Sequence, residues 1–357
     1  MSLIPALEIR NLVKSFADGN VIAVDDVSLA VAPGEILSIL GPSGCGKTTI
    51  MRIMAGLERA DAGDVLLEGR SVLGVPPHKR NVGLVFQDLA IFPHKTVREN
   101  VAFGLRMKGV KGADIGRRVD EALRLVELPP ATFARRMPNE LSGGQRQRVA
   151  VARTIVVEPA VILFDEPMAA LDRRLRDRMA IELRRIQKQL NLAAIYVTHD
   201  QETASMMSDR IAVMLHGRLM QLGTPLEVYR TPANRFVADF IGDMSFVAAT
   251  VSGAENGRTR LDVFGNPLAL ASDLVPAARE VTLGLRPEHV RLEPEKTVDA
   301  IVRGQLKSTY FSGGSFVHRL LLPDGTELVA RSEKAAFQPG QELWVAAAPE
   351  DIRVLAS

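Results

Sequence analysis

The sequence predicts an α/β fold built on a parallel sheet, followed by a smaller all-β domain. Over residues 1 to about 235, short apolar runs alternate with amphipathic stretches, as in buried parallel strands joined by helices. A glycine-rich segment that ends in Gly-Lys-Thr directly follows one of these apolar runs. From about residue 240, short alternating runs are separated by glycine and Asp-Gly turns, which is typical of an all-β domain.

Four apolar runs are predicted to be buried strands of the parallel sheet. Between two of them, residues 172–190 carry apolar side chains three and four positions apart, the spacing of an amphipathic helix. We interpret the seven basic residues of this helix as a solvated outer face, balanced by its acidic residues, rather than as a nucleic-acid stripe. The predicted strands are Glu35–Leu40, Val161–Phe164, Ala193–Val197 and Ile211–Leu215.

Length and composition narrow the class of protein. At 357 residues the chain exceeds the usual size of a single core, which favours two domains. Lys plus Arg exceed Asp plus Glu by only 44 to 42, so nucleic acid is not an expected partner. The one cysteine, Cys45, and a start without signal-peptide features favour the cytoplasm. No run approaches the roughly 18 uncharged apolar residues of a spanning helix, so any membrane association is expected to be peripheral.

The segment Gly-Pro-Ser-Gly-Cys-Gly-Lys-Thr matches the P-loop pattern G-x-x-x-x-G-K-[ST], with a predicted strand before it and a helix after it. Its glycines let the backbone curl so that several N–H groups point at phosphate oxygens. We expect Lys47 to neutralise the β- and γ-phosphates, Thr48 to reach Mg²⁺, and Gly56 to close the helix. The candidate nucleotide-binding residues here are Gly41, Pro42, Ser43, Gly44, Cys45, Gly46, Lys47, Thr48 and Thr49.

The apolar run Val161–Phe164 ends in two acidic residues, Asp165 and Glu166. Ligands of open α/β sheets bind at the carboxyl ends of the strands, which is where these side chains are expected. By itself an acidic pair at a strand end equally fits a solvated edge. Together with the P-loop, it predicts that Asp165 holds Mg²⁺ through water and that Glu166 polarises the attacking water.

The segment Leu141-Ser-Gly-Gly-Gln145, followed by Arg-Gln-Arg, resembles the signature sequence of ATP-binding-cassette (ABC) ATPases. Its serine and glycines open a predicted helix whose free N–H groups and dipole can face a phosphate. In this family the signature of one subunit faces the P-loop of another, so that a head-to-tail dimer encloses two ATP molecules. The resemblance implies this role for Ser142, Gly143, Gly144 and Gln145, and implies that a monomer is inactive.

Further segments match elements of the same family in the family's order. Phe86-Gln87 resembles the Q-loop, Ala169–Asp172 the D-loop and Val197–Asp200 the switch-histidine segment. The resemblance implies that Gln87 contacts Mg²⁺ and the attacking water, and that His199 contacts the γ-phosphate.

Two single positions are also interpreted through the resemblance. Phe16 falls where the family places an aromatic ring that stacks on adenine, a contact that needs only a π-face. Ala169 stands where the family commonly has serine, so we expect a hydroxyl contact across the dimer to be missing and the coupling to be altered. The implied cofactors are ATP and Mg²⁺.

The C-terminal part, with Gly284–His289 and Tyr310–Gly314, resembles the small OB-like (TOBE) β-barrel extension of bacterial importers of the maltose and spermidine/putrescine type. The resemblance implies an ABC ATPase domain at residues 1–238, with a P-loop NTPase fold, and a regulatory or dimerisation domain at 239–357. A helical subdomain is expected within the ATPase domain, at about residues 88–157.

The resemblance also implies a place in a transporter. Leu89–Met107 and Ile241–Phe246 are closer to the polyamine, iron and phosphonate branch than to the sugar branch, and an ATPase for maltose-type sugar import is the alternative. Implied partners are a second copy of the chain, two integral membrane permease subunits that contact 89–107, and a separate solute-binding protein. The implied location is the cytoplasmic face of the bacterial inner membrane.

A soluble or regulatory ABC ATPase is the alternative from another class of protein. Such proteins carry a long coiled-coil insertion, zinc-binding cysteines or tandem cassettes, none of which this sequence contains. The presence of Glu166 and His199 favours continuous turnover of ATP over its use as a switch. The solute does not follow from this chain, because specificity in such importers resides in the binding protein and the membrane subunits.

Overall fold

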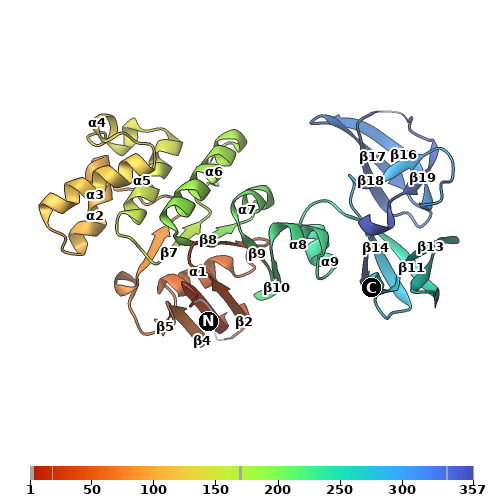
Figure 1. Ribbon diagram of the computed structural model, residues 1–357, viewed down its shortest axis with the longest axis horizontal. Coiled ribbons are helices and arrows are strands. Elements are labelled where there is room, and N and C mark those ends of the chain that lie inside the picture. The colour runs from red at the N-terminus through yellow and green to blue at the C-terminus, as the bar shows by residue number, and fades with distance from the viewer. Residues whose placement is uncertain (1–3, 18, 169–170, 335–336, 357) are drawn as a thin grey trace. The chain divides into compact units, whose positions relative to one another are not determined.

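The chain forms two compact units, Met1–Val228 and Tyr229–Ser357. The computed structural model describes residues 4–17, 19–168, 171–334 and 337–356 (Figure 1). The predicted domain boundary, between 238 and 239, lies inside the second unit. There the short helix α9 (Arg235–Phe240) buries Ala238 against Met244 and Leu355 of that unit.

A six-stranded sheet in the order β10-β9-β3-β8-β7-β6 forms the centre of the first unit. Its strands are parallel except for β10, which pairs antiparallel to β9. The four predicted strands are confirmed, each to within one residue at one end, and every residue of β3 and β8 is buried. The strands are β3 (Ile36–Leu40), β6 (Val82–Val85), β7 (Val161–Asp165), β8 (Ala193–Thr198), β9 (Arg210–Leu215) and β10 (Arg218–Gly223).

The same unit contains a second sheet, which is antiparallel and has the order β2-β1-β4-β5. Helix α1 (Lys47–Ala55) lies between the two sheets (Figure 1). Its apolar side chains join those of both sheets in one buried core. The antiparallel strands are β1 (Leu7–Phe16), β2 (Val21–Val31), β4 (Ala62–Leu67) and β5 (Arg70–Ser71).

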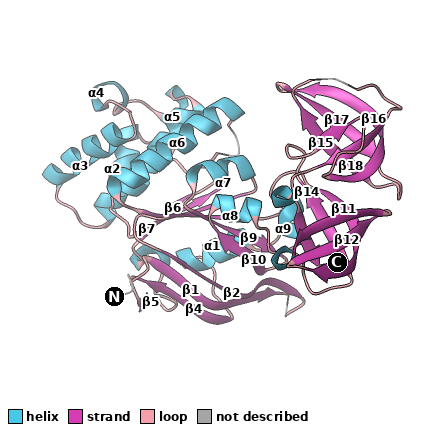
Figure 2. Ribbon diagram, turned by 45° about the vertical axis from the view of Figure 1, so that its right-hand side comes forward, coloured by secondary structure: helices cyan, strands magenta, loops and turns pink. Residues whose placement is uncertain are grey.

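Helices α2 to α5 gather at one end of the first unit (Figure 2). They occupy the stretch predicted as a helical subdomain, and their apolar faces share a core with β7, β8 and α6 (Arg173–Leu190), the predicted amphipathic helix. No helix of the described residues has the length and apolarity needed to cross a membrane. The remaining helices of this unit are α2 (Val97–Met107), α3 (Gly112–Leu125), α4 (Pro130–Phe133), α5 (Gly143–Ile155) and α7 (Gln201–Met207), while α8 (Pro225–Arg230) reaches the boundary.

The second unit is built from two five-stranded antiparallel sheets, which confirms the predicted all-β domain. Alternate residues of both sheets, such as Leu261, Leu283 and Leu320, point into one buried core. One sheet has the order β13-β12-β11-β14-β20 and the other β15-β19-β16-β17-β18. The strands are β11 (Ser245–Glu255), β12 (Arg258–Val263), β13 (Asn266–Ala271), β14 (Glu280–Leu285), β15 (Arg291–Glu293), β16 (Ala300–Ser312), β17 (Ser315–Leu321), β18 (Glu327–Ser332), β19 (Glu342–Ala346) and β20 (Arg353–Ala356).

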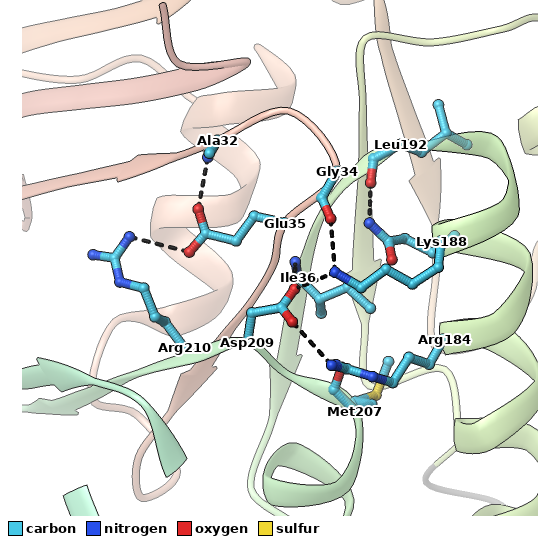
Figure 3. A network of polar contacts seen from close by, with 11 residues as sticks. Ala32, Gly34, Glu35, Ile36, Arg184, Lys188, Leu192, Met207, Asp209 and Arg210 are labelled. Carbon is cyan, nitrogen blue, oxygen red and sulfur yellow. Dashed lines mark hydrogen bonds and ion pairs between the residues drawn. The ribbon is translucent and has the colours of Figure 1, made fainter. Parts of the chain in front are cut away.

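A polar network fixes the N-terminal end of β3 (Figure 3). The Asp209 carboxylate accepts hydrogen bonds from Ile36 N at 2.9 Å, from Arg184 at 2.9 Å and from Lys188 at 3.0 Å. Lys188 also donates to Gly34 O at 3.1 Å. Because β3 runs directly into the glycine-rich loop, this network helps to position the loop.

Candidate nucleotide-binding site

The glycine-rich loop leads from β3 into α1 at the carboxyl edge of the parallel sheet. Helix α1 begins at Lys47, and its N-cap, Gly46, has a φ of 106° and no capping side chain. The first N–H groups of this helix are therefore free to bind an anion, which the helix dipole favours. Lys47 is only 6% exposed, and its Nζ donates to Gly41 O at 2.7 Å and Pro42 O at 2.9 Å.

At two positions of the glycine-rich loop a side chain would clash with the backbone behind the loop. This close packing keeps the loop in the curled shape that can surround a phosphate group. A Cβ on Gly41 would lie 2.4 Å from Met214 O, and one on Gly46 would lie 2.1 Å from Ala23 O. Gly44 has a φ of 78°, with open space around it. The backbone is thus held tightly from behind while the middle of the loop is free to approach a ligand. Among the other predicted residues, Ser43 is exposed, and Pro42, Thr48 and Thr49 are half-buried.

The Cys45 thiol packs beneath this loop. It is 3% exposed, and its Sγ lies 3.8 Å from Lys47 Nζ. Burial raises the pKa of Cys45, although the Lys47 charge and hydrogen bonds oppose the shift. At neutral pH the group is therefore a protonated, poorly reactive thiol.

The side chains of Glu166 and His199 meet at the ends of β7 and β8. Glu166 follows β7 with a φ of 43°, and its N–H donates to Val197 O at 3.0 Å. Its Oε1 lies 3.1 Å from His199 Nδ1. The neighbouring strand therefore fixes the backbone of Glu166, while its carboxylate faces the imidazole.

Asp165 is the last residue of β7 and interacts with the charges of Glu166, Arg52 and Lys47. Burial raises its pKa, the Glu166 charge raises it further, and Arg52 and Lys47 oppose the shift. Within the described part of the chain, no group of three or more His, Cys, Asp and Glu side chains could hold a metal ion. One or two protein oxygens completed by water and phosphate oxygens is the environment that Mg²⁺ usually has beside nucleotides, so the residues fit this ion.

The signature segment forms the start of α5. As predicted, Ser142 is its N-cap, and a capping box joins Ser142 to Gln145 in both directions, with distances of 3.3 and 2.9 Å. Ser142 is exposed and Gly143 half-buried, whereas Gly144 is buried, with Leu175 next to it. The described residues show no hydrogen bond or ion pair between this segment and the P-loop of the same chain.

Gln87 lies exposed in the turn after β6. Two residues further on, the turn is held by Arg153 of α5, which donates to Leu89 O at 2.9 Å and Ala90 O at 2.6 Å. Arg153 is not among the site residues predicted from the sequence, because its partners lie more than 60 positions away. The available indication was an arginine inside an otherwise apolar run.

Phe16 ends β1 and is 40% exposed, so part of its side chain is accessible. Lys14 Nζ lies 5.0 Å from the centre of the ring and is itself paired with Asp61 at 3.1 Å. The predicted D-loop substitution, Ala169, lies outside the described residues.

The topology explains why the P-loop, the acidic pair and the histidine come together. Strands β3, β7 and β8 are parallel neighbours, so the residues that follow them lie along one edge of the sheet. The fold and this edge define the class of P-loop nucleotide-binding proteins. The family profile described as ABC transporter matches residues 24–169, and that of the TOBE domain matches 283–355.

The chain therefore belongs to the ABC transporter family and is an ATPase subunit of that family. It is 46% identical over 349 residues to the spermidine/putrescine import ATP-binding protein PotA of Rubrobacter xylanophilus, covering 96% of this chain and 91% of the relative. The PotA of Vibrio cholerae is 48% identical over 294 residues, 82% of this chain and 77% of the relative. The solved dimeric structure of the ABC transporter cassette MJ0796 is 30% identical, with a TM-score of 0.54, over 61% of this chain and 98% of that one.

Proposed function

We propose that the chain is the ATP-hydrolysing subunit of a polyamine importer with spermidine or putrescine as its solute. The observation that carries this proposal is the 46% identity to a spermidine/putrescine import protein across 96% of the chain, which spans both units. The sequence alone favours a broader branch that includes iron and phosphonate. Maltose-type sugar import is the alternative that the experiment below can detect.

The P-loop is proposed to hold the phosphates of ATP. The free N–H groups at the start of α1 would bind phosphate oxygens, with Gly41–Gly46 curling around them. Lys47 Nζ, which bonds to two loop carbonyls, would turn from them to the β- and γ-phosphates. The exposed side chain of Phe16 would stack on the adenine ring.

Mg²⁺ is proposed to be held by Thr48 directly, by Asp165 through water and by Gln87. When bound, the ion neutralises charge on the phosphate oxygens of the transition state. Thr48 stands in the first turn of α1 beside Lys47, and the raised pKa of Asp165 indicates a carboxylate that a nearby cation would stabilise.

Glu166 is proposed to orient the attacking water and to accept its proton, because its carboxylate is fixed at the carboxyl edge of the sheet. His199 would contact the γ-phosphate while its Nδ1 stays at 3.1 Å from Glu166 Oε1. The two side chains then form one unit, in which the position of each depends on the other.

A head-to-tail dimer is proposed as the active form. Ser142, Gly143, Gly144 and Gln145 of one copy would close over the ATP of the other, and the exposed N-terminus of α5 supports this role. The cassette of MJ0796, which resembles this chain, has been solved as a dimer. Residues 239–357 are proposed as a regulatory or dimerisation domain.

The permease contact is proposed at 89–107, on the cytoplasmic face of the inner membrane, with two permeases and a separate binding protein. In this stretch the rings of Phe92 and Phe103 lie 4.8 Å apart, and Arg153 lies 5.6 Å from Phe92. Arg153 also donates a hydrogen bond to the turn that contains Gln87. A displacement of Phe92 by a permease would therefore move Arg153 and, through it, Gln87. Nucleotide closure and permease movement are thereby coupled.

The test is ATP hydrolysis by the complex captured from native membranes with tagged full-length chain. Spermidine, putrescine, maltose, ferric iron and a phosphonate would each be added with the captured binding protein. Stimulation by the polyamines alone, lost in Glu166→Gln, is the expected result. Stimulation by maltose instead would identify a sugar importer, and capture of no membrane partner would point to a soluble ABC ATPase.

A further inference from the structure

A small, partly open cavity lies beside the pair formed by Glu166 and His199. Its volume is about 30 Å³, and both of these residues line it. Its other walls come from α6, β8 and the N-terminus of α7, and include Arg176, Tyr196 and Thr203. A buried water needs at least about 10–15 Å³, so the cavity has room for one or two.

The hydroxyl of Thr203 is buried in the wall of this cavity, where it interacts with the Asp200 side chain but makes no well-formed hydrogen bond to the described residues. Thr203 is 1% exposed, and its N–H is already used by Asp200 Oδ1 at 2.8 Å. A buried hydroxyl left unpaired costs about 1–3 kcal/mol, so a native structure rarely leaves one in that condition.

Arg176 supplies a second donor to the same cavity. One of its terminal nitrogens donates to the Asp200 carboxylate and the other to Leu171 O at 3.2 Å. Its Nε is buried and, in the described part of the chain, has no partner. Arg176 thereby connects the loop before α6 with Asp200, the residue that follows His199, and keeps one donor for a further ligand.

We propose that this cavity binds ordered water, which joins Thr203 Oγ1 and Arg176 Nε to the Glu166–His199 pair, and that Thr203 is a positioning residue for ATP hydrolysis. A buried water makes about three hydrogen bonds, and the cavity offers donors from Arg176 and Thr203 together with acceptors on Glu166 and Asp200. The role of Thr203 in ATP hydrolysis rests on the proposed function of Glu166 and His199, whereas the water site does not depend on that function.

The water would act on catalysis through geometry. Without the water, the His199 ring and the Glu166 carboxylate contact each other and the solvent. Hydrogen bonds to the water would limit the movement of both groups. A misplaced general base slows the chemical step without weakening the binding of substrate, because the P-loop residues that hold the phosphates do not line the cavity.

The test uses Thr203→Val, which keeps the shape of the side chain and removes the hydroxyl, beside Thr203→Ser, which retains it. Arg178→Ala, an exposed residue of the same helix as Arg176, is the matched control. ATP hydrolysis by the captured complex is expected to show a kcat about tenfold lower for Thr203→Val, the loss of one buried hydrogen bond, with KM within twofold of wild type. Thr203→Ser and Arg178→Ala should match wild type.

Equal kcat values for wild type and Thr203→Val, or an equal loss in Thr203→Ser, would overturn the proposal. A high-resolution crystal structure of the wild-type chain supplies the second measurement, which needs neither a folded variant nor activity. Density for water within hydrogen-bond distance of Thr203 Oγ1 is expected, and an empty cavity would overturn the site. If instead wild type and Glu166→Gln hydrolyse ATP equally, the proposed function fails while the crystal result still decides the water site.

Discussion

Replacing Asp209 by asparagine removes one negative charge from the network at the start of β3. The carboxylate accepts from Ile36 N, Arg184 and Lys188 at 2.9 to 3.0 Å, and an amide of the same size cannot neutralise the two cations (Figure 3). We expect the strand to open more easily at its N-terminal end. Because the P-loop follows β3, the affinity for ATP should also fall.

The size of the effect follows from these contacts. Hydrogen bonds to charged groups contribute about 1.5–3 kcal/mol each when buried, but asparagine retains part of the bonding. The Asp209 side chain is 29% exposed, so solvent screens part of its interaction with Arg184 and Lys188. A net loss of about 2 kcal/mol is therefore expected, which corresponds to a factor of about 30 in the opening equilibrium.

The pH dependence has a definite sign. Burial by itself raises the pKa of Asp209, but the hydrogen bond from Ile36 N and the charges of Lys188 and Arg184 outweigh it, and the pKa is lowered. A lowered pKa stabilises the folded state above the unfolded value, about 3.9, and this contribution is lost as the pH falls through the folded value. The difference between wild type and Asp209→Asn should be full at pH 7 and should shrink below about pH 4.

Hydrogen exchange of the β3 amides, measured by mass spectrometry, is the suitable assay. Protection over Ile36–Leu40 should fall about 30-fold in Asp209→Asn at pH 7. The control is Glu121→Gln, which removes an exposed ion pair with Arg117 and should change protection less than twofold. Unchanged β3 protection in Asp209→Asn, or an equal loss in the control, would refute this reasoning.

Three further predictions concern nucleotide binding. Lys47→Ala should weaken ATP about 10- to 100-fold in equilibrium dialysis, since a charged donor to the phosphates is lost, and unchanged affinity would contradict the assigned role. Phe16→Ala should lower the affinity for ATP about tenfold and leave the affinity for tripolyphosphate unchanged, because tripolyphosphate has no base to stack on the ring. An equal loss of affinity for both ligands would indicate a folding defect instead. Maleimide labelling of Cys45 should be slow at pH 7, because burial raises the pKa of Cys45, and it should accelerate as the pH rises. MgATP should block the labelling. If labelled protein bound ATP with normal affinity, Cys45 would not lie in the P-loop.

The strands of the parallel sheet and their ends could be predicted because each is determined by a pattern of neighbouring residues in the sequence. Wholly apolar runs such as Val161–Phe164 predicted strands to within a residue, and apolar side chains at helical spacing predicted the helix α6. Ser142 was predictable for the same reason, since its cap partner is only three positions away. Local patterns of this kind depend little on the rest of the fold.

The antiparallel sheet of the first unit was not assigned from the sequence. Its strands pair through three register shifts between β1 and β2, which break the alternation that identifies a strand. The contacts of Arg153 with Leu89 and of Arg176 with Asp200 join residues 64 and 24 positions apart. Such side-chain contacts depend on the packing of whole helices, and no local pattern contains them.

The central claim, that this chain hydrolyses ATP with Glu166 at the end of β7, is tested most directly by one measurement. The steady-state rate of ATP hydrolysis in MgATP would be compared for the wild-type complex and Glu166→Gln. The expected result is hydrolysis by the wild type and a loss of about 100-fold or more in the variant, as for removal of a general base. Hydrolysis at the wild-type rate by Glu166→Gln would contradict the account.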